Sequence, residues 1–189
     1  MIRAALLLLL LAGSAAAGPD RLAVEELRLP PVTLVDQHGR AQRLAGPGAL
    51  AGPVVMTFAY TACQSICPLG GGIMAELDAA LGPAPAARLV TLTIDPGRDT
   101  PAALARAAAD YGASDNWLWL TGDPADVRRL LDALGANPAD LVFHDPLFLV
   151  GDLAAGRAVR LQSLPTADDL RALVAAWEEA EDETGAGGS

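Results

Sequence analysis

The stretch that decides the fold runs from Val54 to Pro68 and reads VVMTFAYTACQSICP. It starts with Val54–Tyr60, a nearly continuous apolar run of the kind that forms a central strand buried on both faces. Both cysteines of the chain, Cys63 and Cys67, follow directly. Helical spacing then begins at Ile73. Ligand sites of α/β proteins gather at the carboxyl ends of strands, so we expect the cysteine loop to lie at the functional edge of a sheet.

The rest of the chain alternates strand and helix patterns outward from this stretch. Further strands are predicted at Val32–Val35, Arg88–Ile94, Trp117–Leu120, Leu147–Val150 and Ala158–Leu161. Helices are predicted at Ile73–Leu81, from Asp99-Thr100-Pro101 to about Gly112, from Asp123-Pro124 to Gly135, and at Ala167–Glu178. Strand–helix alternation that ends in a hairpin and a closing helix predicts an α/β fold of the thioredoxin-like type, with a central mixed β-sheet flanked by helices.

The length and the net charge of the chain indicate how many domains it has and which classes of partner it can bind. A chain of 189 residues with 52% hydrophobic residues fits one globular domain. The formal net charge is −10. No basic run with interleaved aromatic residues occurs, and nucleic-acid binding depends on such clustered positive charge. We therefore expect no nucleic-acid partner.

The two ends of the chain differ from the middle. Arg3, an apolar run and the small residues Ser14–Ala17 predict a signal peptide or a short N-terminal anchor over residues 1–17. The apolar run is shorter than the roughly 20 residues of a membrane-spanning helix, which favours cleaved export. Residues 18–178 form the predicted domain. Residues 179–189 are acidic and then glycine-rich, and we expect a disordered tail.

The thiol pair allows three interpretations. It can be a structural disulfide, a redox-active dithiol or a metal site with two thiolate ligands. A helix N-terminus stabilises thiolate, which is the form that binds metals and attacks disulfides. Thioredoxin-type motifs have two residues between their cysteines, whereas Cys63 and Cys67 are separated by three. The spacing alone leaves the three interpretations open.

The chain has two histidines that could add a ligand. His38 lies in an Asp-Gln-His-Gly turn, where we expect an exposed turn residue. His144 lies just before the predicted strand at Leu147–Val150. In a thioredoxin-like arrangement, the loop before the penultimate strand packs beside the cysteine loop. His144 is therefore the candidate third ligand.

Taken together, these segments resemble the Sco/SenC family over about Leu29 to Trp177. The resemblance rests on Cys63-x-x-x-Cys67-Pro68 after Tyr60-Thr61, on Asp95-Pro96 with Arg98-Asp99-Thr100-Pro101, on Asn116–Gly122 and on the late His144. Two departures are visible: Asp145-Pro146 follows the histidine where the family often has a small residue, and the apolar N-terminal run is shorter than the transmembrane helix of many members.

The resemblance implies a function as well as a fold. It implies a copper metallochaperone that binds one copper, as Cu(I) or Cu(II), through Cys63, Cys67 and His144, without substrate turnover. Its implied task is assembly of the binuclear copper site (CuA) of cytochrome c oxidase subunit II. The implied partners are that subunit and other copper-transfer proteins. The implied location is the periplasm or the outer face of the inner membrane, and we expect a monomer.

The residue types suit this chemistry. Thiolates favour Cu(I), and imidazole binds both copper states. Structural zinc sites normally have four ligands, so a set of three indicates an open site. The alternative function is an exported thiol–disulfide reductase that uses Cys63 and Cys67 without metal on the cysteines of the copper acceptor. Three carboxylates have undecided roles: Asp145 either orients a ligand or belongs to a turn, and Asp95 and Asp99 either flank the site or cap the loop and helix.

Overall fold

The computed structural model describes residues 23–83, 85–141 and 144–186. The predicted signal or anchor at residues 1–17 lies outside them. The strands are β1 (Val24–Glu26), β2 (Leu34–Asp36), β3 (Ala41–Gln42), β4 (Val54–Ala59), β5 (Arg88–Thr93), β6 (Trp117–Gly122), β7 (Phe148–Gly151) and β8 (Arg157–Leu161). The helices are α1 (Cys67–Leu81), α2 (Pro101–Asp110), α3 (Pro124–Ala133) and α4 (Ala167–Ala186).

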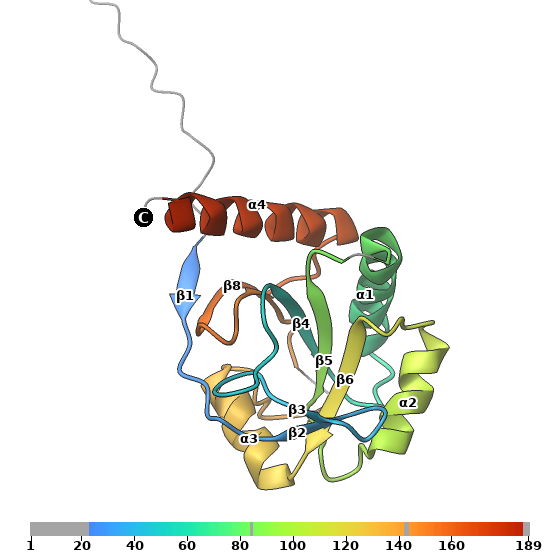
Figure 1. The fold of residues 1–189 in the computed structure, drawn as a ribbon. Helices are drawn as coiled ribbons and strands as arrows, with labels where there is room; N and C mark the ends of the chain where they lie inside the picture. The colour runs from blue at the N-terminus through green and yellow to red at the C-terminus, as the bar shows by residue number, and fades with distance from the viewer. Residues whose placement is uncertain (1–22, 84, 142–143, 187–189) are drawn as a thin grey trace, which may run out of the picture.

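The described strands form one mixed sheet in the order β1-β8-β7-β4-β5-β6-β2-β3. Strands β4, β5 and β6 are parallel, as expected for units joined by crossover helices. Strand β7 pairs antiparallel with β4, so a late segment of the chain lies against the strand that leads into the cysteine loop. Figure 1 shows β4, β5 and β6 at the centre, with α1 and α2 beside them.

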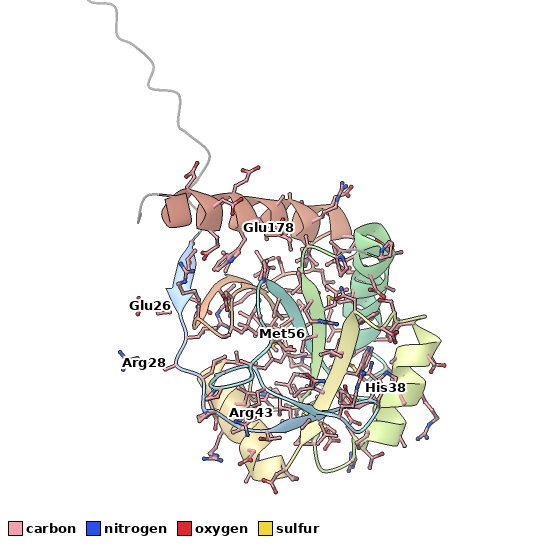
Figure 2. The ribbon with its side chains drawn as sticks, viewed as in Figure 1. Glu26, Arg28, His38, Arg43, Met56 and Glu178 are labelled. Carbon is pink, nitrogen blue, oxygen red and sulfur yellow. A yellow bond between two sulfur atoms is a disulfide. The ribbon has the colours of Figure 1, made fainter. Side chains whose placement is uncertain are left out.

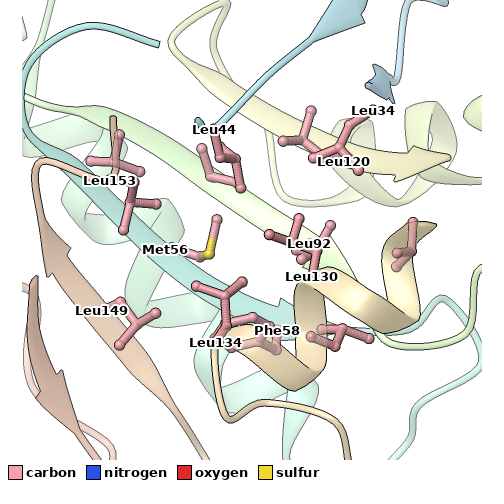
Figure 3. Packing of buried hydrophobic residues seen from close by; sticks show 14 of the residues in the cluster. Leu34, Leu44, Met56, Phe58, Leu92, Leu120, Leu130, Leu134, Leu149 and Leu153 are labelled. Atoms are coloured by element: carbon pink, nitrogen blue, oxygen red, sulfur yellow. The ribbon is translucent and has the colours of Figure 1, made fainter. Parts of the chain in front are cut away.

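The sheet is covered on both faces. Helix α3 covers one face, where Leu130 and Leu134 pack over Met56 of β4 and Leu92 of β5 (Figure 3). Helices α1, α2 and α4 cover the other face, where their buried residues pack against Val55, Leu89, Trp117, Phe148 and Val150. Met56, labelled near the centre of Figure 2, is fully buried. Burial on both faces explains why β4 and β5 have near-continuous apolar sequences.

The predicted fold class and the main elements are confirmed, with differences at element ends. Helix α1 begins at Cys67, earlier than the predicted start at Ile73. Helix α4 begins as predicted, with Thr166 and Asp169 exchanging hydrogen bonds in a capping box. The backbone N–H and the hydroxyl of Thr166 both donate to the Asp169 carboxylate and lower the pKa of that carboxyl. It continues past the predicted end at Glu178 to Ala186, so the expectation of a disordered tail over residues 179–189 is wrong for residues 179–186, which are helical. Glu179, Ala180 and Glu181 have the high helix propensity that carries the helix onward. No helix in the described ranges combines the length and apolar character needed to cross a membrane.

A buried carboxylate organises the turn between β2 and β3. Asp36 is fully buried, and its Oδ1 accepts the N–H groups of His38 and Arg40. Its Oδ2 accepts the side chains of Arg40 and Gln42, each at about 3 Å. Burial raises the pKa of the Asp36 carboxyl, but these hydrogen bonds outweigh burial and hold the pKa below its ordinary value.

The Asp36 turn predicts a pH dependence of stability. A carboxyl whose pKa is lower in the folded state stabilises the fold above its unfolded pKa, and this contribution disappears as the pH falls through the folded pKa. We expect Asp36→Asn to lower the free energy of unfolding at pH 7 by about 1–3 kcal/mol and to lose less stability than the parent below about pH 4. Urea unfolding between pH 3 and pH 7 measures this. Asp168→Asn, at a carboxylate that is 84% exposed, is the control. Parallel pH curves for the parent and Asp36→Asn would contradict the prediction.

Candidate metal centre

The cysteine loop connects β4 to α1 at the carboxyl edge of the parallel strands. The Cys63 N–H donates to the carbonyl of Tyr60 at 3.1 Å, which closes a turn directly after the strand. Cys67 is the first residue of α1, and Pro68 follows in the first turn, where its missing N–H costs nothing. Helix α1 has no side-chain cap. Because Cys67 is its first residue, the Cys67 sulfur belongs to the helix N-terminus, where the positive end of the helix dipole favours thiolate.

The two cysteines form a disulfide in the structure, with their Cα atoms 5.9 Å apart. The pair is therefore described in its oxidised form. Addition of two electrons and two protons gives two thiols, and loss of the protons gives two thiolate donors. Cys67 is buried, whereas Cys63 is partly exposed on the loop. The two sulfurs thus face different surroundings although they lie four residues apart.

His144 lies beside the Cys63–Cys67 disulfide although it comes from a much later part of the chain. Its Nε2 lies 3.6 Å from Sγ of Cys67, across a sequence separation of 77 residues. Its Nδ1 lies 3.3 Å from the backbone carbonyl of Asp145. A carbonyl oxygen only accepts, so this contact favours the tautomer with hydrogen on Nδ1 and a lone pair on Nε2. That lone pair is the one that a metal ion beside Cys67 would use.

The three donor atoms form a compact cluster. Sγ of Cys63, Sγ of Cys67 and a ring nitrogen of His144 all lie within 4.8 Å of one another. After reduction this set offers two soft sulfurs and one nitrogen, which fits a soft ion that accepts low coordination numbers. His38, by contrast, is an exposed residue of the β2–β3 turn and does not belong to this cluster. Figure 2 shows it on that turn.

The carboxylate of Asp99 anchors the start of the cysteine loop. It is only 2% exposed. It accepts hydrogen bonds from the N–H of Thr61, from the hydroxyl of Thr61 at 2.5 Å and from the hydroxyl of Thr93 at 2.5 Å. The cap of α2 is Thr100, whose side chain accepts from the N–H of Ala103. Asp99 therefore joins the loop to β5 rather than capping the helix.

The other two acidic positions lie differently. Asp95 forms an ion pair with the exposed Arg98 at 3.6 Å. Its backbone carbonyl accepts the N–H of Asp99. Asp95 therefore stabilises, through its backbone, the turn that holds Asp99 in position. The contact of Asp145 with His144 comes from its backbone and not from its carboxylate.

A cavity of about 180 Å³ opens beside the disulfide. Cys63, Cys67 and His144 line it together with Thr91, Tyr111 and Trp119. The rings of Tyr111 and Trp119 are stacked with centroids 5.7 Å apart. Burial, and next the charge of Asp110, raise the pKa of Tyr111, so its phenol stays neutral. The sulfur pair therefore borders a chamber whose lining is partly aromatic and partly polar.

Sequence reasoning missed this chamber and the Asp99 anchor. The alternation of Trp117 and Trp119 on one face of a strand signals that both rings point to the same side of the sheet. Gly71 carries a second signal, because a Cβ at this position would overlap the Tyr111 ring. Neither pattern identifies a cavity until the sheet and α1 are placed together.

Known proteins share both the sequence pattern and the fold. The SCO1/SenC family profile matches residues 25–140. A protein of Stutzerimonas stutzeri that is named as copper-binding is 33% identical over 118 residues, which cover 58% of this chain and 53% of that protein. The matches span about half the length of the curated relatives.

Two solved structures illustrate the shared fold. BsSco, described as a member of the Sco family of cytochrome c oxidase assembly proteins and as carrying a disulfide switch, has a TM-score of 0.65 and 24% identity, over 80% of this chain and 93% of that one. Bradyrhizobium japonicum ScoI with copper bound has a TM-score of 0.63 and 24% identity, over 78% and 98%. At these identities the structures establish the thioredoxin-like fold, and the profile match establishes the family: this chain belongs to the SCO1/SenC family.

Proposed function

We propose that this protein binds one copper ion per chain through Cys63, Cys67 and His144 and delivers it to the binuclear copper site of cytochrome c oxidase subunit II. The observation that carries the proposal is the convergence of three suitable donor atoms within 4.8 Å. The names of the relatives support it, because one is named as copper-binding and another was solved with copper bound. In this proposal copper is cargo and is not consumed or transformed.

The donor set favours copper over zinc. Two thiolates and one imidazole suit Cu(I) at low coordination number, while a structural zinc site would need a fourth ligand. The partial exposure of Cys63 leaves one side of the cluster open to an incoming ligand. A site that is open on one side suits a protein that hands its ion to another.

The proposed setting follows from the family and from the N-terminal sequence. We propose that residues 1–17 direct export or tether the chain, so that the domain at 18–178 works in the periplasm or at the outer face of the inner membrane. The proposed partners are subunit II and other copper-transfer proteins, and the domain acts as a monomer. The acidic sequence of residues 179–189 has no role in this proposal.

Titration of the fully reduced protein with Cu(I), in competition with a colorimetric chelator, tests the proposal. We expect saturation at one copper per chain, because the cluster contains one set of ligands. We also expect the affinity to fall as the pH is lowered, because protons compete for the thiolates and the imidazole. Protein held in the disulfide form is the control and should bind little. A ratio well below one copper per chain would refute the proposal. A second assay measures transfer of copper to a purified domain of subunit II.

A second candidate function is favoured by the disulfide itself. The Cys63–Cys67 bond forms within the fold that also gathers the metal ligands. The same pair could therefore reduce a disulfide in the copper acceptor without using metal. The reduced protein would lose two electrons to the target and return to the disulfide form described here. The two functions are compatible, because an oxidised acceptor must be reduced before it can take copper.

A further inference from the structure

We propose that the chamber beside the disulfide is a binding site for a small, uncharged aromatic molecule with an oxygen acceptor, of about the size of benzamide. The inference goes beyond the proposed function, because it concerns an organic ligand and not the metal. It is carried by the size of the chamber, by two buried hydrogen-bond donors in its lining that lack acceptors, and by a described lining without arginine or lysine.

One side of the chamber is a row of three side chains on adjacent strands. Thr57 of β4 pairs with Thr91 of β5, and Thr91 pairs with Trp119 of β6, so the three side chains lie next to one another on one face of the sheet. All three line the chamber, as does Gly70 of α1. A Cβ at Gly70 would lie 3.8 Å from Oγ1 of Thr57, so the helix faces this row. The missing side chain of Gly70 therefore leaves space between α1 and the sheet.

Two hydrogen-bond donors in this row lack acceptors. Trp119 is 3% exposed, and its indole Nε1–H has no partner among the described residues. Thr91 is 2% exposed, and its hydroxyl oxygen accepts the Nε1–H of Trp117 at 2.9 Å, while its own hydrogen has no acceptor among those residues. Buried donors are normally paired, because an unpaired one retains the cost of its lost hydration. An oxygen acceptor bound against this row would supply the missing partners.

The size and the charges of the chamber define the class of ligand. Its volume of about 180 Å³ is close to that of a protein cavity of about 150 Å³ that binds benzene. The stacked rings of Tyr111 and Trp119 form part of the lining, and they favour a flat ring. An anion would meet no arginine or lysine among the described lining residues, and the acidic residue there, Asp110, would repel it. A cation without an acceptor atom would leave both donors unpaired. A neutral ring with a carbonyl oxygen fits both constraints.

The test titrates the disulfide form of the protein with benzamide and follows the indole N–H signals by ¹H–¹⁵N NMR. The chain has three tryptophans, and the signal of Trp119 is the one absent from Trp119→Phe. We expect saturable binding with a Kd on the order of 1 mM and a downfield shift of the Trp119 signal as its N–H gains an acceptor. Benzoate and benzamidinium have nearly the same shape but carry a charge, and each should bind at least about fivefold more weakly. Absence of a saturable shift with benzamide, or equal binding of a charged analogue, would overturn the proposal.

Two alanine variants of α1 locate the ligand even if Trp119→Phe folds poorly. At Gly70, a Cβ would lie 3.8 Å from Phe148 and from Thr57, an ordinary contact that takes up chamber volume without a clash. At Gly72, which does not line the chamber, a Cβ would meet nothing within 4 Å. Alanine has the higher helix propensity at both positions. We expect Gly70→Ala to weaken benzamide binding at least about fivefold and Gly72→Ala to leave it unchanged. Equal affinities in the two variants would exclude the chamber as the site.

The outcome is separable from that of the copper proposal, because the benzamide titration uses the disulfide form and contains no metal. If the copper titration fails while benzamide shifts the Trp119 signal, the metal proposal falls and this inference stands. If benzamide does not bind, this inference falls and the copper proposal is unaffected.

Discussion

Replacing Cys67 by serine is expected to lower the Cu(I) affinity of the reduced protein by at least about a hundredfold, beyond the loss typical of a residue that only supports a ligand. Cys67 is the donor that lies against both other ligands, because its Sγ is 3.6 Å from Nε2 of His144 and is bonded to Cys63 in the disulfide. Serine keeps the size of the side chain but replaces a soft thiolate with a hydroxyl that copper(I) binds poorly. Competition titration against a chelator of known affinity measures the change.

Matched controls lie close to the site. Ser65→Ala removes a hydroxyl 3.7 Å from Sγ of Cys63 without removing a donor of the cluster. His38→Ala removes the imidazole of the β2–β3 turn, outside the cluster. We expect both to bind copper within a few-fold of the parent. Unchanged affinity in Cys67→Ser, with the controls also unchanged, would exclude the proposed ligand set.

Replacing Asp99 by alanine is expected to lower the free energy of unfolding by about 2–4 kcal/mol, in the range for loss of a buried, hydrogen-bonded carboxylate. The hydroxyl of Thr93, which is 1% exposed, would lose its acceptor in the core. The backbone N–H of Thr61 would lose its partner just before the cysteines. We therefore also expect copper affinity to fall by about tenfold, as for other groups that hold a ligand in place. Urea unfolding and the copper titration measure the two effects.

Asp95→Ala is the matched control, since both carboxylates belong to one turn. The Asp95 side chain pairs with an Arg98 that is 78% exposed, at 3.6 Å. The Asp95 side chain is 15% exposed, but the contact is long and its Arg98 partner is exposed, so we expect the pair to contribute about 1 kcal/mol or less. The turn itself depends on the backbone carbonyl of Asp95, which alanine keeps. Similar losses in both variants would show that Asp99 has no special role in anchoring the loop.

The sequence was sufficient to predict the centre of the sheet and the place of the thiols. Val54–Ala59 and Arg88–Thr93 are buried on both faces, so their apolar runs are unambiguous. The cysteine loop follows from its position after β4. His144 could be placed beside the loop only through the assumed topology, because no local pattern links residues 77 positions apart.

The sequence patterns did not predict two edge strands, β1 and β3, or the burial of Asp36 and Gln37. Strand β1 has three residues and β3 has two, and both lie at the edges of the sheet. Their pairing depends on β8 and β2 rather than on their own apolar pattern. Asp36 and Gln37 read as turn residues but are buried. Gln37 bonds the backbone of Trp117 and Trp119, a contact that becomes visible only when the strands are assembled.

The pairing of β7 with β4 in the middle of the sheet determines when the three proposed ligands come together as the chain is synthesised and folds. Cys63 and Cys67 are synthesised before His144. The imidazole of His144 is held beside them only once β7 has inserted between β4 and β8. A nascent or partly threaded polypeptide thus has two thiols and no third donor. Only a chain that has finished folding would then bind the copper ion tightly. A truncated or misfolded chain would lack the third ligand and would bind it weakly.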